Sequence, residues 1–121
     1  MPAGGPSDET RPREPESLIL DYHPEASTEL IEAARFYEGR GTGLGHRLLE
    51  AVDASLAMLQ RNPVAGWSDE CGRRRWFVRR FPYLIIYRLE GSFLHVLAIA
   101  HTSRKPGYWE SRDAGGSSRE C

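Results

Sequence analysis

Lysine, cysteine and long apolar runs are scarce in this chain of 121 residues. Its one lysine, Lys105, accompanies fifteen arginines, and its two cysteines, Cys71 and Cys121, are too few for the disulfide framework of a small secreted domain. The N-terminal region lacks the apolar core of a signal peptide. The longest apolar run, residues 93–100, is interrupted by His95 and is too short to cross a bilayer. These scarcities predict a cytoplasmic protein with no membrane-spanning segment.

Large apolar residues are missing at both ends of the chain. After the initial methionine, residues 1–17 contain four prolines and no large apolar residue, and residues 113–121 are small and polar. Such segments cannot bury enough apolar area to offset the entropy of ordering them. We therefore expect disordered tails at 1–17 and 113–121 around one domain at 18–112. A domain of about 95 residues is large enough to bury roughly 60% of its unfolded surface around one core.

Acidic residues are rare in the last third of the chain. Between Arg73 and Arg112, nine Lys or Arg accompany two acidic residues, which gives a local net charge of +7 in a chain whose net charge is −1. One interpretation is a solvated strand whose charges resist aggregation. The other is a binding surface for RNA, DNA or an acidic protein segment. The second is favoured because the excess continues through Arg104 and Lys105 and is not confined to one strand.

The apolar pattern predicts two helices followed by three strands. Helical spacing after His23-Pro24 indicates a first helix that ends at Glu38-Gly39, and a clearer stripe from Leu44 to Leu59 indicates a second helix that ends at Asn62-Pro63. A short strand at 18–22 precedes them, residues 64–72 form a loop that Trp67 attaches to the core, and β-rich runs follow at 73–80, 81–87 and 93–101. The predicted layout is β-α-α-β-β-β, an α+β fold with a helical hairpin packed on a small, mainly antiparallel sheet.

Four alternating glycines lie between the helices, in the stretch Gly39-Arg-Gly-Thr-Gly-Leu-Gly45. A phosphate-binding loop is one interpretation, but such loops follow a strand, and this stretch follows a helix. The favoured interpretation is a helix C-cap and a tight turn, with Thr42 as the N-cap of the second helix.

The sequence lacks the residue patterns of most catalytic sites. The four histidines, at positions 23, 46, 95 and 101, are scattered, and none pairs with a cysteine or carboxylate at a metal-ligand spacing. No nucleophile motif surrounds Cys71, and acids are too rare near the basic strands for paired-carboxylate chemistry. We therefore expect no metal and no other cofactor.

The segment His101-x-x-Arg104-x-Pro-x-Tyr108-Trp109-x-x-Arg112 has two interpretations. An imidazole, a guanidinium and a phenol within eight residues can perform acid–base chemistry on a phosphodiester. The same groups can form a structural clasp, in which the aromatic rings pack the segment on the sheet. The sequence does not decide between them.

Several motifs in register resemble the RelE/ParE superfamily of bacterial toxins, and its ParE-like, or plasmid stabilisation, branch most closely. They are Phe81-Pro82-Tyr83-x-x-x-Tyr87, then Leu97-Ala-Ile-Ala-His101-x-x-Arg104-x-Pro106-x-Tyr108-Trp109-x-x-Arg112, and upstream His23-Pro24-x-Ala26-x-x-Glu29-Leu30-x-x-Ala33-x-x-Phe36-Tyr37-Glu38 and Gly43-Leu44-Gly45. The resemblance covers residues 18–112 and implies the same β-α-α-β-β-β fold. It also implies a toxin of a type II toxin–antitoxin pair, neutralised by a cognate antitoxin with which it forms a hetero-oligomer.

Two activities are implied by this resemblance. ParE-like members inhibit DNA gyrase without being enzymes, whereas RelE-like members are ribosome-dependent mRNA endonucleases. RelE-like nucleases carry a catalytic arginine where this chain has Leu84, and several lysines where it has none, so the ParE-like activity is favoured and the nuclease is the alternative. A third interpretation is a domain that only titrates an antitoxin.

The candidate site residues follow from the resemblance and the charge. If the chain is a nuclease, its catalytic candidates are His101, Arg104 and Tyr108. The candidates for binding the target or the antitoxin are Arg74, Arg79, Arg80, Tyr83, Trp109 and Arg112. We expect an acidic or amphipathic antitoxin segment to use the helical hairpin and the basic sheet, as a helix in a groove and as an added strand.

Overall fold

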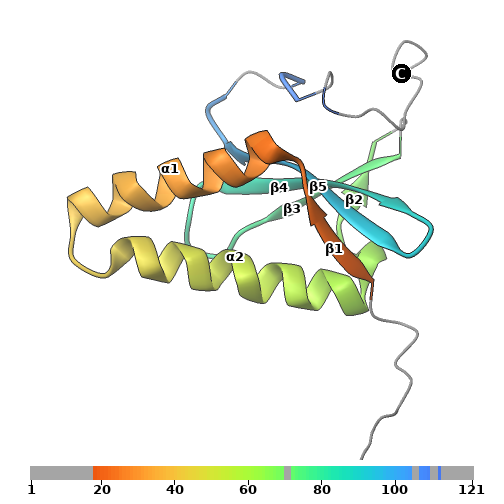
Figure 1. Cartoon of the computed structure of the whole chain (residues 1–121), viewed down its shortest axis with the longest axis horizontal. Coiled ribbons are helices and arrows are strands. Elements are labelled where there is room, and N and C mark those ends of the chain that lie inside the picture. Colours follow the sequence, from red (N-terminus) through yellow and green to blue (C-terminus); the bar gives the residue numbers. More distant parts are fainter. Residues whose placement is uncertain (1–17, 70–71, 105–106, 110–111, 113–121) are drawn as a thin grey trace, which may run out of the picture.

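The computed structural model describes residues 18–69, 72–104, 107–109 and 112, and within them two helices cover one face of a five-stranded sheet (Figure 1). The predicted tails, 1–17 and 113–121, lie outside the described residues. In chain order the elements are β1 (Ile19–Tyr22), α1 (Pro24–Arg40), α2 (Leu44–Arg61), the 3-10 turn η2 (Pro63–Ala65), β2 (Trp67–Ser68), β3 (Arg73–Phe77), β4 (Tyr83–Glu90) and β5 (Phe93–His101). The α+β prediction, with a helical hairpin on a mainly antiparallel sheet, is confirmed.

The sheet has the strand order β1-β5-β4-β3-β2. Only β1 runs parallel to its neighbour, β5, and the other three pairings are antiparallel. The predicted loop at 64–72 was wrong in one respect, because Trp67 and Ser68 form the edge strand β2. The ring of Trp67 does not enter the core; it is half exposed and lies 5.4 Å from the ring of Phe77.

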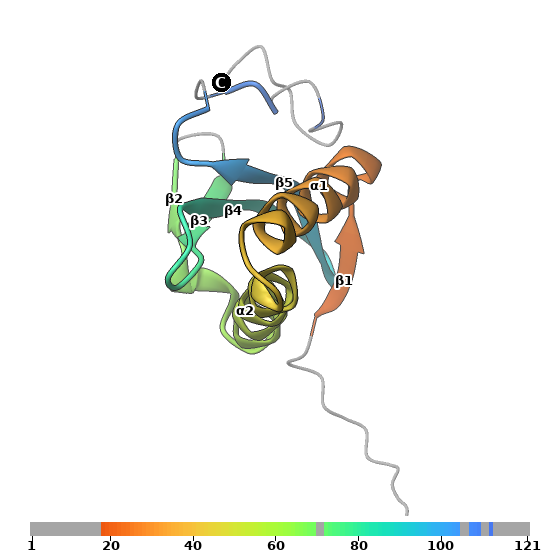
Figure 2. The same ribbon diagram turned by 90° about the vertical axis from the view of Figure 1, so that its left-hand side faces the viewer.

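The main core lies between the helices and the sheet (Figure 2). The predicted stripe of α2 is buried there, through Leu48, Val52, Leu56 and Leu59. Alternate residues of β4 face it, namely Tyr83, Ile85 and Tyr87, because successive side chains of a strand point to opposite faces. Burying such side chains supplies most of the stabilisation, about 25 cal/mol for each Å² of apolar surface.

A bulge in β5 gives the sheet a second apolar cluster. Ile86 pairs with Ala98 and Tyr87 pairs with Val96, so Leu97 is an extra residue on β5. Residues on the face opposite the helices form the cluster, and Trp109 from the C-terminal segment is buried against them. Trp109 and Tyr108 are therefore part of the packed structure.

Glu38 closes the turn between the helices and explains the glycine-rich stretch. Its carboxylate accepts hydrogen bonds from the N–H of Gly43, at 2.9 Å, and of Gly45, at 3.0 Å. These bonds, first that from Gly43 and then that from Gly45, lower the pKa of Glu38. The predicted N-cap, Thr42, was wrong: Gly43 occupies the N-cap position with φ 86°, and the carboxylate of Glu38 serves as the acceptor. The amide groups that a phosphate would need are therefore already bonded.

Close approach of the helices sets the identity of one glycine. A Cβ on Gly45 would lie 2.4 Å from the carbonyl oxygen of Ala34 in α1. Gly45 therefore allows α2 to begin directly against α1. Neither helix is long and apolar enough, within the described residues, to cross a membrane.

Candidate functional site

A groove of about 770 Å³ lies between α2 and the β3–β4 connection. Its apolar wall is formed by Leu44, Ala51, Ala54, Met58, Trp76 and Phe81. Three arginines line it, Arg47 from α2 and Arg79 and Arg80 from the connection, and no carboxylate of the described chain pairs with them. Glu50 also lines it, 3.1 Å from His46. The groove therefore combines an apolar wall with uncompensated positive charge.

The connection holds Arg80 in an unusual backbone conformation. Its φ is 68°, in the left-handed region that residues other than glycine rarely adopt. Both Arg79 and Arg80 are exposed. The strand predicted at 73–80 ends at Phe77, so these two arginines belong to the groove and not to the sheet face.

The arginines of β3 are bonded to other groups of the chain. Arg73 is buried, and its Nη1 lies 3.9 Å from Asp69 Oδ2, while Arg75 Nη2 lies 3.6 Å from the same oxygen. Arg74, a predicted binding residue, donates hydrogen bonds to the carbonyl oxygens of Gly66, at 2.7 Å, and Val64, at 3.4 Å. The predicted concentration of positive charge is therefore divided between arginines bonded within the sheet and exposed arginines, of which Arg79 and Arg80 lie at the groove.

Glu29 of α1 holds the C-terminal segment on β5. Its carboxylate accepts from the backbone N–H of Ile99 at 3.0 Å, from the hydroxyl of Tyr108 at 2.8 Å and from both terminal nitrogens of Arg112 at 3.0 Å. Arg112 also donates to the carbonyl oxygen of Leu97, at 3.0 Å. Strand β1 pairs with β5 only as far as Val96. Beyond Val96, the side chains of Glu29 and Arg112 bond the β5 backbone on the edge that β1 leaves open.

Tyr108 lies between a carboxylate and two guanidiniums. Burial, and then its hydrogen bond to Glu29, raise the pKa of its hydroxyl. The guanidinium carbon of Arg104 lies 3.9 Å from the centroid of its ring, and that of Arg112 lies 5.1 Å away. Arg104 itself is exposed. Tyr108 and Arg112 are thus bonded to α1 and β5, and Arg104 stacks on the ring of Tyr108.

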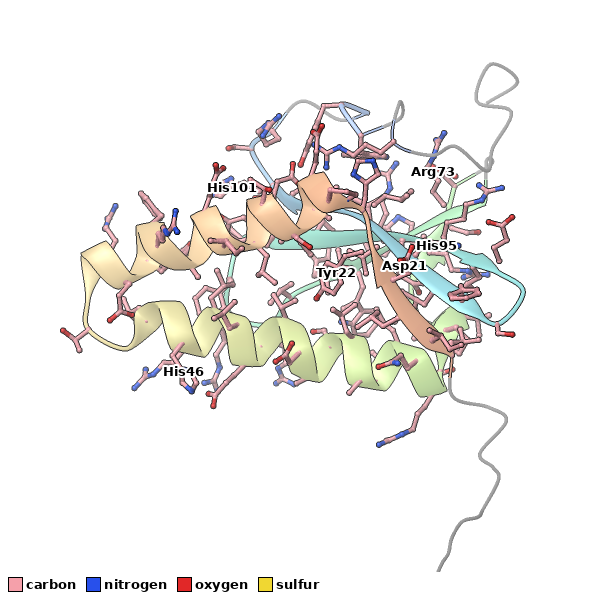
Figure 3. The ribbon with its side chains drawn as sticks, viewed as in Figure 1. Asp21, Tyr22, His46, Arg73, His95 and His101 are labelled. Atoms are coloured by element: carbon pink, nitrogen blue, oxygen red, sulfur yellow. The ribbon has the colours of Figure 1, made fainter. Side chains whose placement is uncertain are left out.

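The third catalytic candidate, His101, lies at the end of β5, where Figure 3 shows it apart from His46 and His95. Its Nδ1 accepts a hydrogen bond from the N–H of Ser103 at 3.0 Å. Its ring meets that of Tyr83 edge to face at 5.1 Å. The neutral imidazole in this arrangement carries its proton on Nε2.

The remaining predicted residues are buried in different cores. Tyr83 faces the helices, and burial, followed by the nearby Tyr37, raises its pKa. Trp109 belongs to the opposite cluster, with the guanidinium carbon of Arg75 5.4 Å from its ring. The structure therefore places Arg79 and Arg80 together, and Tyr108, Trp109 and Arg112 together, at two separate sites.

In the described part of the chain, no three His, Cys, Asp or Glu side chains form a group that could hold a metal ion. His95 instead bonds Asp21, with Nδ1 2.8 Å from Oδ2, and joins β5 to β1 (Figure 3).

No sequence pattern predicted a role in a site for Arg47, Trp76 or Glu29. Arg47 and Trp76 come from elements that the chain brings together only in three dimensions. Glu29 was part of the motif in the resemblance. It follows Glu25 by four residues, so the two carboxylates lie on one face of the helix. That acidic face was the available signal for the partner that Arg112 provides.

The fold and the motifs together agree with a known family. The model of the family described as "ParE toxin of type II toxin-antitoxin system, parDE" matches residues 20–106. The chain belongs to the ParE toxin family. The resemblance to the ParE-like branch of the RelE/ParE superfamily is thereby confirmed. A type II toxin–antitoxin system implies an antitoxin partner for this ParE toxin.

The ParE fold is also present in a solved structure, the "Chromosomal ParDE TA system from P. aeruginosa". The TM-score is 0.63 with 21% sequence identity, over 71% of this chain and 97% of that chain. At this identity the likeness shows the shared fold. No curated protein matches the chain.

Proposed function

We propose that this ParE toxin inhibits DNA gyrase in the cytoplasm without acting as a ribonuclease. The observation that carries this proposal is the hydrogen bond from the Tyr108 hydroxyl to Glu29, at 2.8 Å. A hydroxyl with a raised pKa that already donates to a carboxylate is poorly suited to general acid–base work. Leu84, which stands where RelE-like nucleases carry an arginine, packs against the apolar cluster under Trp109.

The antitoxin occupies the groove between α2 and the β3–β4 connection. Its apolar wall and its three unpaired arginines fit an amphipathic helix that carries carboxylates along one side. The described arginines of the sheet are less available, because Arg73, Arg74 and Arg75 are bonded within the chain. We therefore assign antitoxin binding to Arg47, Arg79 and Arg80, of which the last two were candidates from the sequence.

A gyrase assay tests the proposal directly. Toxin separated from its antitoxin, and verified to rebind it, is incubated with gyrase, plasmid and ATP, and supercoiling and cleaved DNA are measured. We expect supercoiling to stop or cleaved plasmid to accumulate, and added antitoxin to restore normal activity. Unchanged supercoiling by toxin that rebinds its antitoxin would overturn the gyrase target.

The second candidate is ribosome-dependent mRNA cleavage, with His101, Arg104 and Tyr108 as the catalytic residues. It is favoured by the exposure of Arg104, whose guanidinium has no carboxylate partner among the described residues. Cleavage of mRNA on translating ribosomes, lost in Arg104→Ala, would establish this activity in place of gyrase inhibition.

A further inference from the structure

Five aromatic rings follow one another across one end of the molecule. Phe36 contacts Tyr37, with ring centroids 5.3 Å apart, and Tyr37 contacts Phe81 at 5.2 Å and Tyr83 at 6.3 Å. Tyr83 contacts His101 at 5.1 Å. The row therefore runs from the end of α1 through Tyr83 of β4 to the end of β5, and Phe81 of the β3–β4 connection joins it beside Tyr37. Figure 1 shows the β3–β4 connection and the end of β5 at the end of the sheet that lies toward the α1–α2 connection.

Arginines accompany this row along its length. The guanidinium carbon of Arg40 lies 5.2 Å from the centroid of Phe36. Arg79 and Arg80 immediately precede Phe81, and Arg104 follows His101, whose carbonyl oxygen accepts its N–H at 2.9 Å. All four arginines are exposed, and within the described chain none pairs with a carboxylate.

Two carboxylates near this row, those of Glu38 and Glu29, bond groups outside it. Glu38 directs both carboxylate oxygens to the backbone of the helix connection. Glu29 is bonded to Tyr108 and Arg112. The positive charge of the row is thus open to a ligand from outside.

The exposure of Phe36 points to the kind of ligand. Its side chain is 54% exposed, and its described ring contacts are with Tyr37 and the guanidinium of Arg40. Of the other rings in the row, Tyr37, Phe81 and His101 are half-buried and Tyr83 is buried, so Phe36 is the ring that a ligand can cover fully. An exposed ring among arginines is an element by which proteins bind single-stranded nucleic acid: the ring stacks on a base and the guanidiniums contact phosphates. An acidic protein segment would use the arginines but would have no need of the rings.

We propose that this aromatic row, with Arg40, Arg79, Arg80 and Arg104, is a binding surface for single-stranded DNA. The choice of DNA rests on the proposed function, because gyrase acts on DNA. Binding reads no base sequence, since every base has a face that can stack. The surface shares Arg79, Arg80 and Phe81 with the groove assigned to the antitoxin, so the antitoxin and the DNA strand exclude each other.

Fluorescence anisotropy with a labelled 20-residue oligothymidylate and the full-length toxin, verified to rebind its antitoxin, tests the proposal without gyrase. We expect saturable binding whose log affinity falls with log salt by a slope of about −2 to −3, at about −0.7 for each phosphate contact. Arg40→Ala and Arg104→Ala each make that slope shallower by about 0.7. Phe36→Leu weakens binding by about fivefold or more and leaves the slope unchanged, because a ring stacks without releasing counterions. Arg61→Ala, an exposed arginine in the last turn of α2, is the control with the same charge change and leaves binding unchanged.

Several results would overturn the proposal. Absence of binding at low salt would do so, as would equal weakening by Arg61→Ala and Arg104→Ala, which would indicate unspecific attraction. Normal binding by Phe36→Leu, together with equally tight binding of polyglutamate, would assign the surface to an acidic protein. Clearly tighter binding of oligouridylate than of oligothymidylate would assign it to RNA. Each of these results leaves the gyrase assay unaffected, so the two proposals fail separately.

Discussion

Glu29 and Arg112 form a two-pronged ion pair across 83 residues of sequence, with Nη1 3.0 Å from Oε1 and Nη2 3.0 Å from Oε2. Their side chains are only 15% and 10% exposed. The same two groups bond the N–H of Ile99 and the carbonyl oxygen of Leu97. A helix residue and a C-terminal residue thereby complete the edge of β5, and the C-terminal segment is fixed to the fold as a consequence.

Replacing Glu29 should therefore cost more than an ordinary surface charge. Glu29→Gln removes the largely buried charge that Arg112 pairs with and leaves it the exposed carboxylate of Glu25, and we expect a loss of about 2–3 kcal/mol in the free energy of unfolding, measured by urea denaturation. Glu25→Gln is the matched control, since Glu25 is 68% exposed and lies 3.2 Å from the same arginine. It should cost less than about 1 kcal/mol. Equal losses in the two variants would refute the role assigned to Glu29.

Tyrosine burial predicts a loss of stability in alkaline solution. The pKa of Tyr22 is raised to about 12 by burial and by Asp53, and that of Tyr108 is raised by burial and by Glu29. A raised pKa means that the folded state keeps protons that the unfolded state releases. The contribution of these tyrosines to the free energy of unfolding is therefore fully present below pH 10, the ordinary tyrosine pKa. It falls as pH rises above 10, by up to about 1.4 kcal/mol per pH unit for each such group. Urea denaturation between pH 8 and 11 measures this, and Tyr108→Phe should show a shallower fall; an unchanged slope would contradict the assignment.

The sequence was sufficient to predict the two helices and the longer strands, but not to predict which residues form the site. The stripe from Leu44 to Leu59 and the strand at 93–101 are local patterns, and the structure confirms them. Whether an arginine is free depends on groups far away in the chain. Arg74 and Arg79 look alike in sequence, yet one bonds carbonyl oxygens of a turn and the other stays exposed at a groove.

Strand β2 escaped prediction for a related physical reason. It has two residues and pairs only with β3, so it carries no hydrophobic period of its own. Glu29 escaped because helical periodicity marks it simply as a polar residue, although its carboxylate is largely buried. Its partners are 70 to 83 residues away.

Two glycines of the helical hairpin should respond oppositely to alanine. A Cβ on Gly45 would meet the carbonyl oxygen of Ala34 at 2.4 Å, so Gly45→Ala should separate the helices and cost about 1–3 kcal/mol. A Cβ on Gly39, within α1, has no atom within 4 Å, and Gly39→Ala should stabilise the protein by about 0.4–1 kcal/mol. Thermal unfolding of the two variants measures both effects. A stable Gly45→Ala would mean that the hairpin is less tightly packed than described.

The groove arginines offer a test in which binding and stability change in different directions. In Arg79→Ala/Arg80→Gly both guanidiniums are removed, while glycine suits the φ of 68° that Arg80 adopts under strain. We expect the free energy of unfolding to be unchanged or slightly raised, and antitoxin affinity, measured by calorimetry, to fall about tenfold or more with a weaker dependence on salt. Arg61→Ala should change neither affinity nor its salt dependence, since Arg61 lies in the last turn of α2 and does not line the groove. A loss of affinity without a loss of stability excludes misfolding as its cause. Unchanged affinity in the double variant would remove the groove from the antitoxin interface.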